Sequence, residues 1–219
     1  MIPRFSVVDP ELTYSLPPEI SASSGLDALT QLIEPFVCNA PNPITDAVCK
    51  DGIARASQAL LSAYRNGQDA AARQDMSLAS LFGGMALANA RLGAVHGMAS
   101  PIGGVTGAPH GAICAALLPV VMESNIKALQ NRQSGFEPLE RYTKVARLLT
   151  GDDSATAMDG PDWVDRLCRD MNIRSLSVLG LRSVDFSGVV AQSQKSSSMK
   201  GNPISLTKRE LNSILEKAF

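Results

Sequence analysis

The chain has 219 residues, of which 45% are hydrophobic and 19% charged, with a formal net charge of −1. This balance excludes a disordered chain, and because Lys and Arg are scattered rather than gathered in a basic stripe, we expect no nucleic-acid partner. Four cysteines outside any CxxC pattern, no signal-peptide pattern at the start and no run of about 18 uncharged apolar residues predict a cytoplasmic protein with reduced thiols and no membrane partner.

The first elements predicted along the chain are a short strand and a helix. Residues 5–8, FSVV, favour the strand, which the following DPEL ends. After a helical turn opened by two prolines, residues 23–37, SSGLDALTQLIEPFV, place apolar side chains at helical spacing. Ser24 is the expected N-cap of this helix, and Pro35 should end or bend it near its last turn.

The middle and the end of the chain predict further helices. Asn42 before a proline predicts the start of a helix over residues 43–65, and the small residues of LFGGMALANA favour close packing of the next one, over about 69–91. A Gly-rich turn is expected after residue 99, a polar loop at 131–137 and an irregular segment at 174–184. The remaining helices are expected over about 93–99, 109–123, 138–149, 161–171 and 185–194 and after Thr207, which forms a capping box with Glu210.

About nine helices and almost no strand signal predict an all-α fold, a helical bundle. No fixed-period repeat or long linker divides the chain, so residues 1–219 are expected to form one domain. A division near residues 125–137 into two helical subdomains in contact is the alternative.

The stretch AVHGMASPIGGVTGAPHG, residues 94–111, holds the only two histidines of the chain, His96 and His110. Chance, core filling and a metal site are the three interpretations. Asp27 lies within an apolar helical face, where a charged group is costly unless it is paired or bound to a metal. One carboxylate and two imidazoles from three helices would make an open site for a divalent metal, whereas Asp27 near a helix start would simply favour the helix dipole.

Three segments carry a family resemblance: VDPELTYSLPPEISASSGLDALTQLIEPFV, AVHGMASPIGGVTGAPHGAICAALLP and SSSMKGNPISLTKRELNSILEKA. Together they resemble the iron-containing (group III) alcohol dehydrogenase family, in the same order and over nearly the whole chain. The resemblance implies that the fold is the C-terminal helical half of these enzymes, of the dehydroquinate synthase-like type.

The resemblance also implies a metal site, position by position. Asp27 matches the Asp ligand of the GxDAL motif, and His96 and His110 match the third and fourth ligands. The second ligand, a His in the family, is Gln31 here, and an amide is a weak ligand for Fe²⁺ or Zn²⁺. Ser100 stands at the substrate-side position, where the family has another His. Asp27, His96 and His110 are thus expected to hold Fe²⁺ or Zn²⁺.

The resemblance implies an enzyme of two domains, of which the N-terminal α/β domain binds NAD(P). Neither Gly83-Gly84 nor Gly103-Gly104 follows a strand or fits G-x-G-x-x-G, so we expect this domain to be absent and NAD(P) to bind only together with it. The implied activity is the interconversion of a small alcohol and its aldehyde by metal-assisted hydride transfer to or from NAD(P), and this chain alone is expected to be inactive. A homo-oligomer or a nucleotide-domain partner is expected. The alternative is a free-standing helical relic or binding protein without catalysis.

Overall fold

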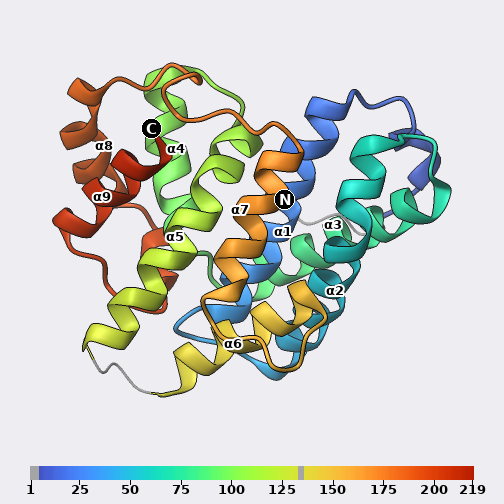
Figure 1. The fold of residues 1–219 in the computed structure, drawn as a ribbon, viewed down its shortest axis with the longest axis horizontal. Coiled ribbons are helices and arrows are strands. Elements are labelled where there is room, and N and C mark those ends of the chain that lie inside the picture. The colour runs from blue at the N-terminus through green and yellow to red at the C-terminus, as the bar shows by residue number, and fades with distance from the viewer. Residues whose placement is uncertain (1–4, 133–135) are drawn as a thin grey trace.

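The computed structural model describes residues 5–132 and 136–219, and within these residues it contains nine α-helices, three short 3-10 helices and no strand (Figure 1). The predicted all-α fold is therefore confirmed. The α-helices are α1 (Pro18–Val37), α2 (Pro43–Arg65), α3 (Ala70–Asn89), α4 (Ala94–Thr106), α5 (His110–Arg132), α6 (Phe136–Thr150), α7 (Asp159–Asp170), α8 (Phe186–Ser193) and α9 (Lys208–Ala218). The 3-10 helices are η1 (Pro10–Thr13), η2 (Ser183–Asp185) and η3 (Ser198–Gly201).

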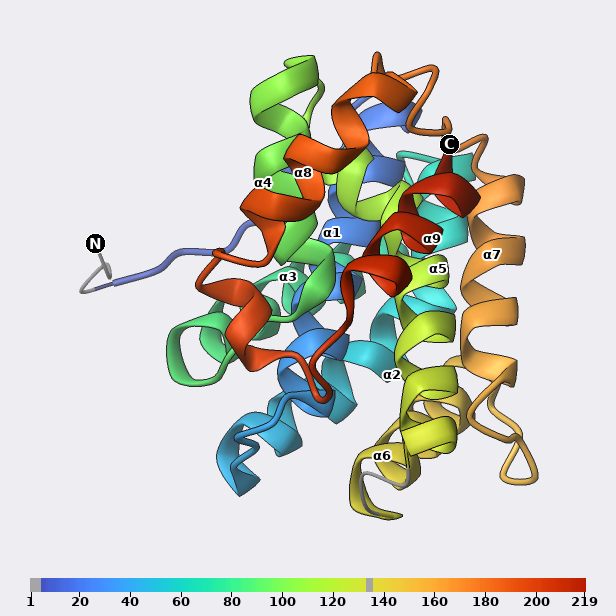
Figure 2. The ribbon, with the colours of Figure 1, turned by 90° about the vertical axis from the view of Figure 1, so that its left-hand side faces the viewer.

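Helices α1 and α5 form the centre of the bundle and pack against each other. Helices α2 and α3 pack on α1, while α4, α7 and α9 pack on α5 (Figures 1 and 2). One continuous core contains buried side chains from both sides of the region 125–137, for example Leu26 and Val164. The middle of α1, the start of α4 and the start of α5 thereby come together within the bundle.

Local capping signals place two of the helix starts correctly. The Asn42 side chain accepts a hydrogen bond from the Thr45 backbone N–H at 3.0 Å, and α2 begins at the next residue, Pro43. At α9, Thr207 and Glu210 each accept a hydrogen bond from the other's backbone N–H. These two boundaries follow from short-range hydrogen bonds, which a sequence pattern records directly.

Two predictions for the N-terminal part are wrong. Residues 5–9 form no strand: they project from the bundle (Figure 2), and no neighbouring strand among the described residues pairs with them.

Helix α1 begins at Pro18, not at Ser24, because the proline's fixed φ suits the first helical turn. Ser24 lies inside the helix, and its hydroxyl donates to the Ile20 carbonyl at 2.6 Å. Pro35 lies two residues before the end of α1, as expected.

The Gly-rich turn expected after residue 99 is also wrong, because α4 continues to Thr106 and includes both glycines of the Gly103-Gly104 pair. Ile102, fully buried in the core, anchors this part of the helix. Helix α4 ends only at Gly107, whose φ of 69° is in the left-handed region that favours glycine.

Helix α5 is longer than the predicted 109–123, and α6 begins at Phe136 instead of 138. Residues 133–135 of the expected polar loop lie outside the described residues. By length and composition α5 is apolar enough to cross a membrane, but 67% of its apolar window is buried inside the protein. Such burial is typical of the core helix of a folded domain.

Candidate metal centre

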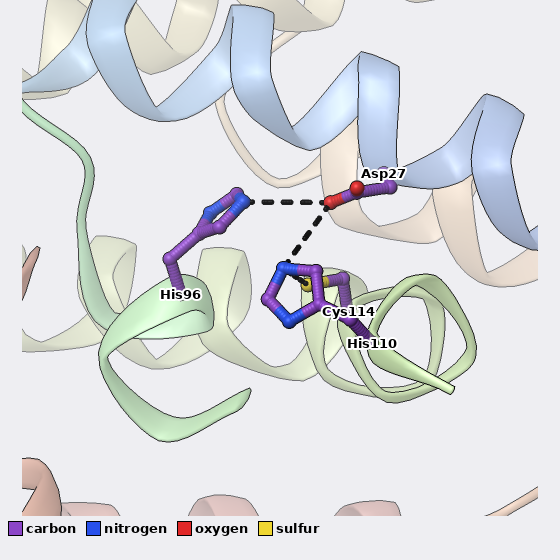
Figure 3. A group of neighbouring side chains, drawn as sticks. All are labelled: Asp27, His96, His110 and Cys114. Atoms are coloured by element: carbon purple, nitrogen blue, oxygen red, sulfur yellow. Dashed lines mark hydrogen bonds and ion pairs between the residues drawn. The ribbon is translucent and has the colours of Figure 1, made fainter. Parts of the chain in front are cut away.

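Asp27 lies in the middle of α1, on the side that faces the starts of α4 and α5 (Figure 3). It is nine residues beyond the start of α1, so the alternative interpretation of Asp27 as a carboxylate favouring the helix dipole is wrong. Its side chain is 18% exposed. The amide nitrogen of Gln31, one turn later, donates to Asp27 Oδ2 at 3.1 Å, which leaves Oδ1 facing the two histidines.

His96 approaches Asp27 from the first turn of α4 and is 8% exposed. Its Nε2 lies 3.4 Å from Asp27 Oδ1, and its Nδ1 lies 2.7 Å from Glu34 Oε2. The other oxygen of Glu34 accepts a hydrogen bond from the Val95 backbone N–H at 2.7 Å. Glu34 therefore holds both the imidazole and the backbone of α4, and directs His96 Nε2 toward Asp27.

His110 is the first residue of α5, and its side chain is 50% exposed. Its Nε2 lies 3.8 Å from the same oxygen of Asp27. The approach of α5 to α1 requires glycine at position 111, where a Cβ would lie 2.8 Å from the Ser23 carbonyl oxygen. Gly111 thus allows the two helices to come close enough for His110 to reach Asp27.

A fourth side chain, Cys114, completes the group. The ligand atoms of Asp27, His96, His110 and Cys114 all lie within 4.8 Å of one another, and Figure 3 shows the four side chains pointing toward a common point. Asp27 Oδ1 and His96 Nε2 are buried and make no hydrogen bond. Buried polar atoms of this kind are costly unless a partner satisfies them, and the donor set suits a divalent transition metal. The residues therefore fit a metal ion.

The charges of the group support the same interpretation. Burial opposes the ionisation of Asp27, but its interaction with His96 and the positive charges of the two imidazoles hold its pKa below the ordinary value. Burial also opposes the charging of His96, yet Asp27 and Glu34 raise its pKa to about 9. In the metal-free chain the carboxylates thus retain a proton on His96, and a bound cation would take over the role of that positive charge.

A buried amide network fixes the start of α4, which carries His96. Asn202 Oδ1 accepts hydrogen bonds from the Ala94 backbone N–H at 3.0 Å and from Asn125 Nδ2 at 3.1 Å. Asn202 Nδ2 donates to Asn125 Oδ1 at 2.7 Å. The KGNP segment near the C-terminus therefore positions one half of the metal centre, although it contributes no ligand.

The five side chains expected at the site divide into three that converge and two that do not supply a free ligand atom. Asp27, His96 and His110 converge on one point. Gln31 is adjacent but its amide nitrogen is already hydrogen-bonded to Asp27. Ser100 is exposed on α4, one turn beyond His96.

Glu34 and Cys114 were not among the residues expected at the site. Each had a local signal: Glu34 is an acidic residue inside the apolar LTQLIEPF, and Cys114 follows His110 by four residues, the spacing that places two side chains on one helix face. The contact of Glu34 with His96 spans 62 residues, and no spacing rule predicts it.

A cavity of about 520 Å³ lies on the neighbouring face of α1. It is bordered by residues 6–9, by Ser24 and Ala28 on α1 and by part of α3. Asp27, His96 and His110 do not line it, and of these three side chains His110 is the one that is half exposed to solvent.

Comparison with known proteins identifies relatives over the whole length of the chain. The family model described as "Fe-containing alcohol dehydrogenase family, C-terminal" matches residues 21–219. Alcohol dehydrogenase 4 of Saccharomyces cerevisiae is 37% identical over 218 residues, which are 99% of this chain and 55% of that protein. The 1,3-propanediol dehydrogenase of Klebsiella pneumoniae is 33% identical and is covered to 56%. The chain thus spans about half the length of these relatives.

Solved structures agree with the sequence comparison. A 1,3-propanediol oxidoreductase superposes with a TM-score of 0.87 at 32% identity, over 96% of this chain and 55% of that one. The alcohol dehydrogenase from Oenococcus oeni superposes with a TM-score of 0.86 at 33% identity, over 96% and 54%. In both cases the match covers a little over half of the other protein.

Proposed function

The chain belongs to the Fe-containing alcohol dehydrogenase family, and from this premise we propose that it is the metal- and substrate-binding part of an NAD(P)-dependent alcohol dehydrogenase. In this proposal Asp27, His96 and His110 hold one divalent ion, Fe²⁺ or Zn²⁺. The observation that carries the proposal is the convergence of these side chains around two buried ligand atoms, Asp27 Oδ1 and His96 Nε2, which lie 3.4 Å apart and make no hydrogen bond.

Each residue of the site has a separate task in the proposed reaction. A divalent metal acts as a Lewis acid, which favours loss of the proton from an alcohol or polarises a carbonyl group. Asp27 supplies the negative charge that retains the cation, and Glu34 keeps His96 in the tautomer that presents Nε2 to the site. His110 lies at the exposed edge, where a small alcohol or aldehyde would approach.

The dinucleotide is proposed to bind to a separate α/β domain, since the Gly83-Gly84 and Gly103-Gly104 pairs lie inside helices α3 and α4 and neither forms a phosphate-binding turn. Phe5 and Val7, 89% and 92% exposed, give the chain an apolar N-terminal segment that such a domain or a second copy of the chain would cover. The four free, buried cysteines agree with a location in the cytoplasm.

A fusion protein tests the proposal. Residues 1–219 are joined to the N-terminal half of the Saccharomyces cerevisiae relative, and the fusion and the chain alone are assayed with small primary alcohols and NAD⁺ or NADP⁺. We expect metal-dependent reduction of the dinucleotide by the fusion and none by the chain alone. A fusion that folds and binds metal but does not reduce NAD(P)⁺ would favour the non-catalytic alternative.

A further inference from the structure

We propose that Cys114 is a metal ligand in this chain, so that the centre is an Asp-His-His-Cys site with a thiolate in its coordination shell, to which a substrate oxygen would add as a fifth ligand. The inference rests on the metal site proposed above and adds a ligand to it. Cys114 has no counterpart among the ligand positions expected from the sequence, where Gln31 stood at the second position beside Asp27, His96 and His110.

The spacing along α5 brings the two ligands together. His110 and Cys114 are four residues apart on one helix, and Cys114 Sγ lies 3.4 Å from His110 Nε2. With metal–nitrogen bonds of about 2.0 Å and a metal–sulfur bond of about 2.3 Å, the ligand atoms of a tetrahedral site lie roughly 3.3–3.6 Å apart. The measured separations of His96 Nε2 and His110 Nε2 from Asp27 Oδ1, 3.4 and 3.8 Å, are close to the same edge length.

Gln31 is poorly placed for the role that Cys114 fills. Its amide nitrogen carries no free lone pair, and that nitrogen is the atom turned to the site, where it donates to Asp27 Oδ2. Its amide oxygen lies toward α3, 3.5 Å from the position of a Cβ on Gly83. The fourth side chain whose ligand atom lies within the group is therefore Cys114 of α5, not Gln31.

The other three thiols of the chain have different surroundings. Cys38, Cys49 and Cys168 are free and buried, and none of them belongs to the group of ligand atoms among the described residues. Cys168 Sγ instead donates to the Ala115 carbonyl at 3.6 Å. Cys168 thus serves as a matched control, because it is also a buried thiol on a helix beside α5.

A thiolate changes the metal that the site prefers. On binding, the Cys114 S–H bond is replaced by a sulfur–metal bond, and the proton is released to solvent. Compared with a site of carboxylate and imidazole ligands alone, a site with a soft thiolate ligand favours Zn²⁺ over Fe²⁺. Co²⁺ serves as the spectroscopic substitute for Zn²⁺. The chain is therefore expected to select Zn²⁺ over Fe²⁺.

Co²⁺ titration of the purified chain tests the proposal. Thiolate coordination produces an intense near-ultraviolet charge-transfer band, which imidazole and carboxylate ligands do not. We expect the band in the natural chain and in Cys168→Ala, its loss in Cys114→Ala and Cys114→Ser, and a loss of Zn²⁺ affinity of at least about tenfold in both Cys114 variants.

The outcomes separate the two proposals. Co²⁺ bound by the natural chain with visible d–d bands but no charge-transfer band would overturn the role of Cys114 and leave the metal site in place. Absence of any Co²⁺ or Zn²⁺ binding would overturn the site itself. Absence of the band in the natural chain would overturn the role of Cys114 whether or not the variants fold, and its loss in Cys114→Ser but not in Cys168→Ala would assign it to Cys114.

Discussion

The two histidines face the same oxygen of Asp27 but belong to different surroundings. His96 is 8% exposed, its second nitrogen is bound to Glu34, and its helix start is held by Asn202. His110 is 50% exposed and has Cys114 as its neighbour. The centre therefore has a fixed half, which is built into the core around His96, and an open half, which faces solvent at His110. Metal retention should depend on both halves, but stability mainly on the fixed one.

The largest effect is expected from Glu34→Ala. The substitution leaves His96 Nδ1 and the Val95 N–H without their buried partner, so the free energy of unfolding should fall by about 3–5 kcal/mol. Zn²⁺ affinity should fall about 10- to 100-fold, because the imidazole is no longer oriented. Urea denaturation and chelator competition measure the two effects. Glu140→Ala, in an exposed ion pair, is the control and should change neither by much. If Glu34→Ala bound Zn²⁺ as tightly as the natural chain, Glu34 would not be needed to orient His96 for metal binding.

The two histidines themselves give the next comparison. In the presence of EDTA, His96→Ala should lower the free energy of unfolding by about 3 kcal/mol, because Glu34 is then buried without its partner. His110→Ala should lower it by less than about 1 kcal/mol, since that side chain is half exposed. Both variants should lose at least about tenfold in Zn²⁺ affinity. Equal destabilisation by the two substitutions would remove the distinction between the halves.

A smaller effect is expected at the junction of α1 and α5. Gly111→Ala places a methyl group against the Ser23 carbonyl and should cost about 1–3 kcal/mol of stability while moving His110 away from Asp27. Gly104→Ala is the matched control: its Cβ meets no atom within 4 Å, and the helix should gain up to about 1 kcal/mol. Thermal unfolding with and without Zn²⁺ measures both. If Gly111→Ala bound Zn²⁺ as tightly as the natural chain, the close approach would not matter for the site.

The smallest effect is expected from Gln31→His, which sharpens the comparison by adding an imidazole to the fixed half. An imidazole is a better ligand than an amide, so Fe²⁺ affinity should rise by on the order of tenfold, about 1.4 kcal/mol. Anaerobic Fe²⁺ titration measures the change. Gln68→His, on the exposed surface, is the control. An unchanged affinity would show that position 31 does not reach the ion.

The sequence predicted those features that depend on neighbouring residues. The starts of α2 and α9 follow from capping side chains within three residues, and the group Asp27, His96 and His110 follows from motifs that the family resemblance aligned. The strand at residues 5–8 failed because β-branched side chains favour a strand only where a partner strand exists.

Long-range contacts explain what the sequence did not predict. The Gly-rich part of α4 is helical because Ile102 is buried against the bundle, which outweighs the low helix propensity of its glycines. The acidic Glu34 stands out in an apolar segment, but its partner His96, 62 residues later, is known only from the contact between α1 and the first turn of α4.

The central claim is that Asp27 joins two histidines to hold one divalent metal. Elemental analysis of the chain after loading with Zn²⁺ and gel filtration tests it most directly, with Asp27→Ala as the variant and Asp51→Ala, in an exposed ion pair, as the control. We expect one Zn²⁺ per chain in the natural protein and in Asp51→Ala, and almost none in Asp27→Ala. Equal metal content in the natural chain and in Asp27→Ala would contradict it.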